Sequence, residues 1–229
     1  MNKVIEGITN LLFIIDDQQL DKVPAQGPLI IVANHINTFD APVVLSRAYP
    51  RPIRTFAKIE TFKNPLLGAL FKIWGGIPLH RGEGDITAFK MGLQALQNNE
   101  ILIILPEGTR SHDGALLPAK PGVSILAQRS NAPILPVVYY GGEAWRRNLK
   151  QFKRTPFKIV VGSPFRIRAN GHRLTSDDRQ KLVDEIMYQL AVLLPAQYRG
   201  AYTDIGGATE DFLQFDPNVP SNLSFAHHS

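Results

Sequence analysis

The chain has 229 residues, a formal net charge of +5 at pH 7 and a hydrophobic content of 44%. This length suits one sizeable hydrophobic core and is short for two. The absence of cysteine excludes disulfides, thiolate metal ligands and a cysteine nucleophile, and it leaves the cytosol as the default compartment.

Apolar runs are short throughout the sequence. The run at residues 11–15 ends at Asp16 and Asp17, which is too early for a secretion signal, and no stretch reaches the roughly 18 apolar residues of a membrane span. The basic charge suits an anionic partner such as a phosphorylated small molecule, an anionic lipid surface or nucleic acid. Without a Lys/Arg run or a basic-aromatic repeat, we expect no nucleic-acid partner.

Residues 3–15 predict an amphipathic helix with Val4, Ile8 and Leu11 on one side, which either packs on the core or lies on a bilayer. Residues 29–33 predict a buried strand, and polar residues follow it at once. In a mostly parallel sheet the carboxyl end of such a strand opens into a ligand-binding crevice. His35 and Asp40 are therefore expected to lie there, within reach of each other.

Two roles are open for Asp40. It precedes a helix predicted at 41–48, with Pro42 in the first turn, and so could be the N-cap. Alternatively, its carboxylate could hold one ring nitrogen of His35 and leave the other nitrogen free to accept a proton. The nucleophile would then be a hydroxyl of the substrate.

The next segments predict a strand at 53–57, a helix from Pro65 to about residue 74, a strand within 76–79 and a helix at 85–97 capped by Asp85. The helix from Pro65 is apolar nearly all round, so it belongs either to the core or to an interface with lipid. Arg81 follows the strand, where its guanidinium could hold a phosphate or form a surface ion pair.

A second buried strand, ending near residue 105, leads into the turn Pro106-Glu107-Gly108-Thr109-Arg110. Gly108 allows backbone N–H groups to approach a ligand, and Arg110 can bind a phosphate, although an internal pair between Glu107 and Arg110 is the alternative. Lys120 places a cation beside the start of a helix predicted at 123–130, which favours an anion site.

The remaining sequence predicts a strand at 132–140, a strand at 157–161 and a helix that begins at Thr175 and stops at Pro195. Prolines 133 and 136 suggest that the first of these strands is an edge strand or begins irregularly. We predict an amphipathic segment at 1–23, one α/β domain at 24–195 with a largely parallel central sheet flanked by helices, and a partly disordered tail at 196–229.

Four blocks then stand out in order along the chain. They are Asn34-His35 with Asp40 five positions after the histidine, residues 76–81 (GIPLHR), residues 106–111 (PEGTRS) and residues 132–138 (APILPVV). This arrangement resembles the glycerolipid acyltransferase family, whose typical member is a 1-acylglycerol-3-phosphate acyltransferase. The resemblance covers about residues 24–195.

The resemblance implies transfer of an acyl group from acyl-coenzyme A or acyl carrier protein to the free hydroxyl of 1-acylglycerol-3-phosphate, giving phosphatidic acid, without a further cofactor or a metal. It makes His35 the base and Asp40 the residue that orients it. Acceptor binding falls on Arg81, Glu107, Gly108, Thr109 and Arg110, to which we add Lys120 for its place at a helix start. Because Glu107 is anionic, we expect it to position the turn or Arg110 rather than to touch phosphate.

The sequence also allows other hypotheses about function: the same chemistry on another lysophospholipid or an amino-acid lipid, a non-catalytic lipid-binding module, or a metal-dependent hydrolase. Many family members carry N-terminal membrane spans, and we see none in this sequence. We therefore expect a cytoplasmic protein, peripheral to the membrane, that contacts lipid through residues 3–15 and 62–74 and through its basic surface.

Overall fold

The computed structural model describes residues 2–47, 51–80, 84–168 and 174–224. Its central sheet contains β1 (Phe13–Asp16), β7 (Thr155–Val161), β6 (Ile134–Tyr140), β2 (Leu29–Ala33), β5 (Ile101–Ile104), β3 (Ile53–Lys58) and β4 (Gly76–Leu79), in that order across the sheet. The helices are α1 (Asn2–Leu12), α2 (Asp40–Arg47), α3 (Pro65–Ile73), α4 (Ile86–Gln97), α5 (Gly122–Ser130), α6 (Trp145–Lys150) and α7 (Ser176–Ala191).

Short elements complete the described part of the chain. These are the two-stranded ribbon of β8 (Arg166–Ile167) and β9 (Leu213–Gln214), and the 3-10 turns η1 (Gln18–Lys22), η2 (Ile59–Lys63), η3 (Gly142–Ala144), η4 (Ala196–Tyr198), η5 (Gly200–Tyr202) and η6 (Ile205–Gly207).

Most of the sheet is parallel. Strand β2 pairs in parallel with β5 and β6, and β3 pairs in parallel with β5 and β4. Among the described strands of this sheet, only the β6–β7 pairing is antiparallel, and β1 runs parallel to β7 at the sheet edge. The predicted α/β fold with a largely parallel sheet is confirmed.

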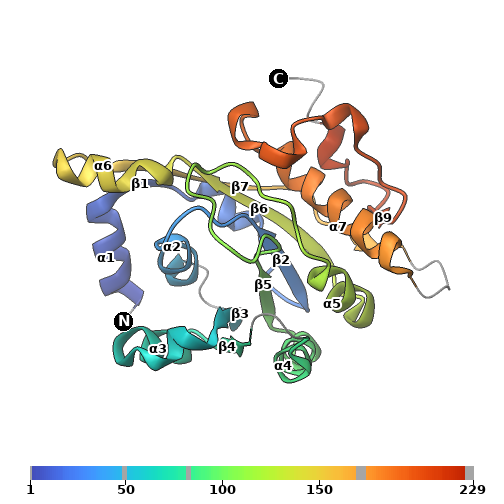
Figure 1. Ribbon diagram of the computed structural model, residues 1–229, viewed down its shortest axis with the longest axis horizontal. Helices are drawn as coiled ribbons and strands as arrows, with labels where there is room; N and C mark the ends of the chain where they lie inside the picture. Colours follow the sequence, from blue (N-terminus) through green and yellow to red (C-terminus); the bar gives the residue numbers. More distant parts are fainter. Residues whose placement is uncertain (1, 48–50, 81–83, 169–173, 225–229) are drawn as a thin grey trace.

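Helices cover both faces of the sheet, as Figure 1 shows, with α4, α5 and α7 on one face and α1 and α2 on the other. The five residues of β2 are all buried and alternate between the two cores. Ile30 and Val32 pack with α5 and α7, whereas Ile31 packs with α2. A strand covered on both faces must be apolar throughout, which explains the uninterrupted sequence LIIVA.

Strand β6 corrects the expectation of an edge strand, because it lies between β7 and β2 near the middle of the sheet. Pro133 precedes the strand, and its carbonyl still accepts from Ile30 N. The Pro136 carbonyl accepts from Gly162 N just beyond the end of β7, so the N–H that proline lacks would point past the last pair of that ladder, Val137 with Val161. The prolines are tolerated because neither removes a bond inside a ladder.

The N-terminal segment also differs from the single predicted helix at 3–15. Helix α1 ends at Leu12, and residues 13–16 form the edge strand β1, whose Phe13 is fully buried. Helix α1 packs on the core through Ile5 and Leu12, while the face that carries Val4 is exposed. This helix therefore has one apolar side in the core and a second in solvent.

The C-terminal segment shows little periodicity in the sequence, yet residues 196–224 fold against α7. Helix α7 begins with the predicted capping box, in which Thr175 and Asp178 each accept a bond from the other's backbone N–H. On the same helix the buried carboxylate of Glu185 accepts from the Thr209 hydroxyl and from two backbone N–H groups, those of Asp211 and Phe212. One buried acceptor thus holds residues 209–212 of the segment that follows the helix.

Candidate active site

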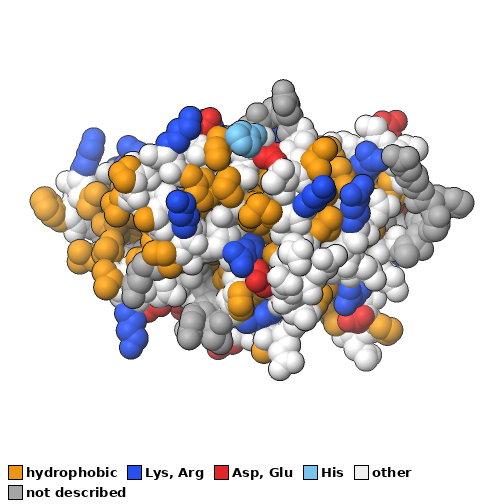
Figure 2. All heavy atoms as spheres, turned by 90° about the horizontal axis from the view of Figure 1, so that it is seen from below, with side chains coloured by type: hydrophobic (Ala, Val, Ile, Leu, Met, Phe, Trp, Pro, Cys, Tyr) orange, Lys and Arg blue, Asp and Glu red, His pale blue; other side chains and the backbone are white. Residues whose placement is uncertain are grey.

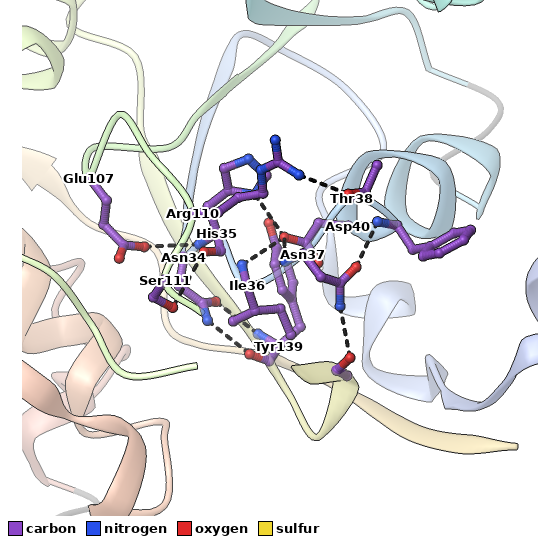
Figure 3. Close-up of polar contacts among 12 residues, drawn as sticks. Asn34, His35, Ile36, Asn37, Thr38, Asp40, Glu107, Arg110, Ser111 and Tyr139 are labelled. Atoms are coloured by element: carbon purple, nitrogen blue, oxygen red, sulfur yellow. Dashed lines mark hydrogen bonds and ion pairs between the residues drawn. The ribbon is translucent and has the colours of Figure 1, made fainter. Parts of the chain in front are cut away.

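His35 and Asp40 face each other at the carboxyl end of β2. The Asp40 carboxylate lies 2.8 Å from His35 Nδ1, and the exposed fractions of the two side chains are 2% for Asp40 and 22% for His35. Figure 3 shows the pair above the β2–α2 loop. Because the carboxylate holds Nδ1, the other ring nitrogen of His35 is the one that can accept a proton from a ligand.

Asp40 also organises the loop that carries His35. Its Oδ2 atom accepts from the backbone N–H groups of Ile36 at 2.7 Å and of Asn37 at 2.9 Å. These donors precede α2, so the carboxylate closes the β2–α2 loop and does not cap the N–H groups of the helix that follows. Burial raises the pKa of Asp40, while the His35 ring and the two N–H groups act in the opposite direction.

Two asparagines fix this loop to the neighbouring strand β6 and to the turn η3 that follows it. Asn34 donates to the carbonyl of Tyr139 and accepts from the Tyr139 N–H, so its amide extends the β2–β6 ladder by one rung. Asn37 donates to the carbonyl of Gly142. Each bond joins residues 105 positions apart in the chain, and we did not predict either one. Their sequence signal is only that both amides lie in the short connection that follows a buried strand.

Glu107 holds the same loop from the other side. Its exposed fraction is 2%, and its two carboxylate oxygens accept from His35 N and Leu117 N, each at 2.9 Å. Burial raises the pKa of Glu107 to about 7. The carboxylate therefore joins the turn after β5 to the backbone of His35, and no bond between Glu107 and Arg110 is present among the described residues.

The other residues of this turn lie at the rim of the site. Arg110 is exposed and donates to the Thr38 hydroxyl at 2.8 Å, so its guanidinium lies across the His35 loop. Gly108 has a φ of +66°, and a Cβ at this position would lie 3.6 Å from Lys120 Nζ. Arg110 and Lys120 thus bring two cations to the edge of the site, whereas the predicted site residue Arg81 lies outside the described residues.

An apolar cavity of about 290 Å³ opens beside the pair. Its walls are the α2 face of the sheet, helix α2 and η1, and its lining includes His35, Asp40, Ile31, Val44 and Ile101. Ile101 pairs with Leu29 at the start of β2, so the cavity runs along the strand away from His35. Such a space fits a hydrocarbon chain whose reacting end lies at His35.

In the described ranges, no group of three or more His, Cys, Asp or Glu side chains is arranged to bind a metal. The site offers instead a base held by a buried carboxylate, an apolar cavity and two cations at the rim. This set can deprotonate a hydroxyl while holding an apolar chain and an anionic group.

The family model described as "Acyltransferase" matches residues 14–140, more than half of the chain. The chain belongs to the acyltransferase family. Two relatives named 1-acyl-sn-glycerol-3-phosphate acyltransferase are one from Bacillus subtilis, 27% identical over 74% of this chain and 82% of that protein, and one from Limnanthes douglasii, 36% identical over 59% of this chain and 49% of that protein.

Among solved structures, this acyltransferase is similar in fold to the crystal structure of the 1-acyl-sn-glycerophosphate acyltransferase PlsC from Thermotoga maritima. The TM-score is 0.57 at 24% identity, and the match covers 81% of this chain and 76% of the other. The matched family region extends from β1 to the end of β6 and so contains both strands that lead into the site. The family resemblance expected from the four sequence blocks is confirmed.

Proposed function

We propose that this acyltransferase moves a fatty acyl group from acyl-coenzyme A or acyl carrier protein to the free hydroxyl of 1-acylglycerol-3-phosphate, giving phosphatidic acid. The observation that carries the proposal is the contact between His35 and the buried Asp40 at the mouth of an apolar cavity. The names of the relatives in Bacillus and Limnanthes support the choice of acceptor.

In the proposed reaction the free ring nitrogen of His35 takes the proton of the acceptor hydroxyl. The oxygen then attacks the thioester carbonyl carbon, and the tetrahedral intermediate collapses with loss of the thiolate, which takes the proton back from His35. The products are the new ester and a free thiol. Asp40 stabilises the imidazolium between the two proton transfers and keeps the ring in the correct tautomer.

We assign the two cations at the rim of the site to binding of the acceptor phosphate. Arg110 and Lys120 can both donate to phosphate oxygens, and Arg110 is held over the loop by Thr38. From the sequence we add Arg81 to this set. Glu107 takes a positioning role, since both of its oxygens are engaged with backbone N–H groups.

We assign the cavity beside α2 to the acyl chain. It is lined mainly by apolar side chains and ends at His35 and Asp40, where the reacting carbonyl would lie. An apolar enclosure also keeps water away from the thioester, which favours transfer over hydrolysis.

We further propose that the protein works at a membrane surface, where its lipid acceptor resides. Helix α3 buries only Gly68, while Leu66 and Ile73 point into solvent, and α1 exposes Val4 and Leu11. Figure 2 shows hydrophobic side chains gathered at the end of the molecule that carries α1 and α3. Within the described ranges no helix has both the length and the apolar character needed to cross a bilayer. Contact through these helix faces is the arrangement we propose.

The choice of acceptor is tested by offering the purified chain an acyl thioester with one of three acceptors: 1-acylglycerol-3-phosphate, 1-acylglycerol or a lysophospholipid with a larger headgroup. We expect efficient transfer to the first and little to the second, because only the first carries the phosphate that Arg110 and Lys120 would bind. Preferred transfer to the larger headgroup would reassign the acceptor, and absence of transfer to any of the three would favour a lipid-binding module.

A further inference from the structure

We propose that residues 145–154, a basic turn that consists of α6 and the chain leading into β7, bind the headgroups of anionic phospholipids and insert Phe152 into the bilayer. This inference adds a second lipid contact to the one proposed for α1 and α3, and its purpose rests on the proposed function. The binding itself needs no substrate, so it can be measured separately.

The charge of the basic turn is of one sign. The sequence WRRNLKQFKR carries five cations and no acid: Arg146, Arg147, Lys150, Lys153 and Arg154. All five are exposed, and none lies within 4.0 Å of a carboxylate among the described residues. Apolar and amide residues separate them, which is why the sequence shows no continuous run. Exposed cations that form no ion pair each favour binding to an anionic surface.

An apolar side chain stands among these charges. Phe152 is 99% exposed and has a φ of +53°, in the left-handed region. The turn is closed by three backbone bonds, from Gln151 N and Lys153 N to the Asn148 carbonyl and from Phe152 N to the Leu149 carbonyl. Leu149, one turn earlier, is also exposed. A fixed turn that displays a phenyl ring among cations has the chemistry of a bilayer interface, where rings enter the acyl boundary and cations meet phosphate.

The basic turn is continuous with the apolar end of the molecule. Arg154 donates to the carbonyl of Phe13 through both Nε and Nη2, which places the turn beside the α1–β1 junction and the exposed Ile14. Figure 1 shows α6 at the same end as α1 and α3. This continuity favours a lipid surface over an acidic protein partner, because a bilayer would cover the cations and the exposed apolar faces of α1 and α3 together.

The turn is also connected to the catalytic loop. Trp145 packs edge-on against Phe39, with ring centroids 4.9 Å apart, and Phe39 directly precedes Asp40. Gly142, just before α6, accepts from Asn37 in the same loop. Binding of the turn to a bilayer would therefore place His35 near the surface in which the acceptor lies.

The test measures cosedimentation of the full chain with vesicles of phosphatidylcholine alone and of phosphatidylcholine mixed with phosphatidylglycerol. The charge variant is Arg147→Gln with Lys150→Gln and Lys153→Gln. Its control removes three exposed cations from α4, α5 and α7 (Lys90→Gln, Arg129→Gln and Lys181→Gln). The charge variant should lose about 100-fold in affinity for the anionic vesicles, and the control should lose little.

The ring is tested with Phe152→Asn, which removes the phenyl group but suits a positive φ and so should preserve the turn. We expect about tenfold weaker binding to both kinds of vesicle, with recovery in Phe152→Trp. Equal losses in the charge variant and its control, equal binding of the unaltered chain to both kinds of vesicle, or unchanged binding of Phe152→Asn would overturn the proposal. A charge variant that keeps vesicle binding but loses affinity for acyl carrier protein would assign the turn to that partner instead.

Discussion

At the scale of single residues, Asp40 makes two kinds of contact, and we propose a separate role for each. Its Oδ2 atom accepts from two backbone N–H groups of the loop and also lies against His35 Nδ1. An asparagine can keep the backbone bonds through its oxygen but offers no charge to the imidazolium. We expect Asp40→Asn to lower kcat by about 10²- to 10⁴-fold with a melting temperature close to that of the unaltered chain.

Steady-state kinetics and thermal melting check this prediction together. Asp40→Ala is the comparison variant, because it removes the loop bonds as well and should lower both activity and melting temperature. Full activity of Asp40→Asn would leave Asp40 with the loop function alone.

Arg110 is expected to act on the acceptor and not on the donor. Removing a charged donor to phosphate in Arg110→Ala should raise the KM for 1-acylglycerol-3-phosphate about ten- to hundredfold and change the KM for the acyl thioester little. Thr38→Val, which removes only the hydroxyl that Arg110 contacts, is the matched control and should have a smaller effect. An equal rise in both KM values for Arg110→Ala would count against the phosphate role.

The raised pKa of Glu107 leads to a prediction about how the free energy of unfolding depends on pH. Burial raises the pKa of its carboxyl from 4.5 to about 7, so the folded state binds the proton more tightly than the unfolded state. The group therefore contributes stability below about pH 4.5, and this contribution is lost as the pH rises through about 7. The loss amounts to at most roughly 3 kcal/mol in the free energy of unfolding.

Denaturant unfolding of the unaltered chain and of Glu107→Gln over this pH range tests the assignment. The stability of the unaltered chain relative to the variant should decrease with rising pH, because glutamine does not titrate. Parallel pH profiles would show that Glu107 keeps an ordinary pKa.

The polar residues that follow a strand could be predicted from the sequence, but their distant hydrogen-bond partners could not. His35 and Asp40 are five positions apart, and their contact could be predicted from one short connection. The bonds of Asn34 to Tyr139 and of Asn37 to Gly142 depend on β6 lying beside β2, which local pattern does not reveal. The two oxygens of Glu107 likewise bind N–H groups whose position only the folded loop defines.

At the scale of elements, periodicity and capping signals predicted α4, α7 and the buried strands closely. Residues 3–15 were predicted as a single helix because their pattern is apolar on two sides. In the structure the helix ends before Phe13, which is buried in the edge strand β1. Pro136 favoured an edge position for β6, since a proline at the end of a ladder looks the same in sequence as one in an edge strand. Boundaries and strand order depend on pairing, which residue type alone does not fix.

The folding of residues 196–224 on α7 leads to a prediction for Glu185. Its carboxylate is buried and accepts three hydrogen bonds, so Glu185→Ala leaves two backbone N–H groups without partners. We expect a loss of about 2–4 kcal/mol in the free energy of unfolding, measured in urea. Asp177→Ala, on the same helix but exposed, should cost much less. Equal stability of the two variants would mean that the segment contributes little to the fold.

At the scale of the whole molecule, the sheet places the proposed base, the proposed acyl-chain cavity and the proposed lipid contacts close together. Strand β2 and the turn after β5 deliver His35 and Glu107 to one crevice, the cavity runs along the adjacent face of the sheet, and α1, α3 and α6 lie at one end of the protein. This arrangement follows the general rule that parallel sheets bind ligands at the carboxyl ends of their strands.

The central claim is that His35 is the base of an acyl transfer to a hydroxyl. Its most direct test follows free thiol release from an acyl-coenzyme A thioester on vesicles that contain 1-acylglycerol-3-phosphate, with the unaltered chain and with His35→Ala. We predict release that depends on the acceptor and is abolished by the substitution. Acceptor-dependent release of equal rate from both proteins would contradict the claim, because the proton would then leave the hydroxyl without His35.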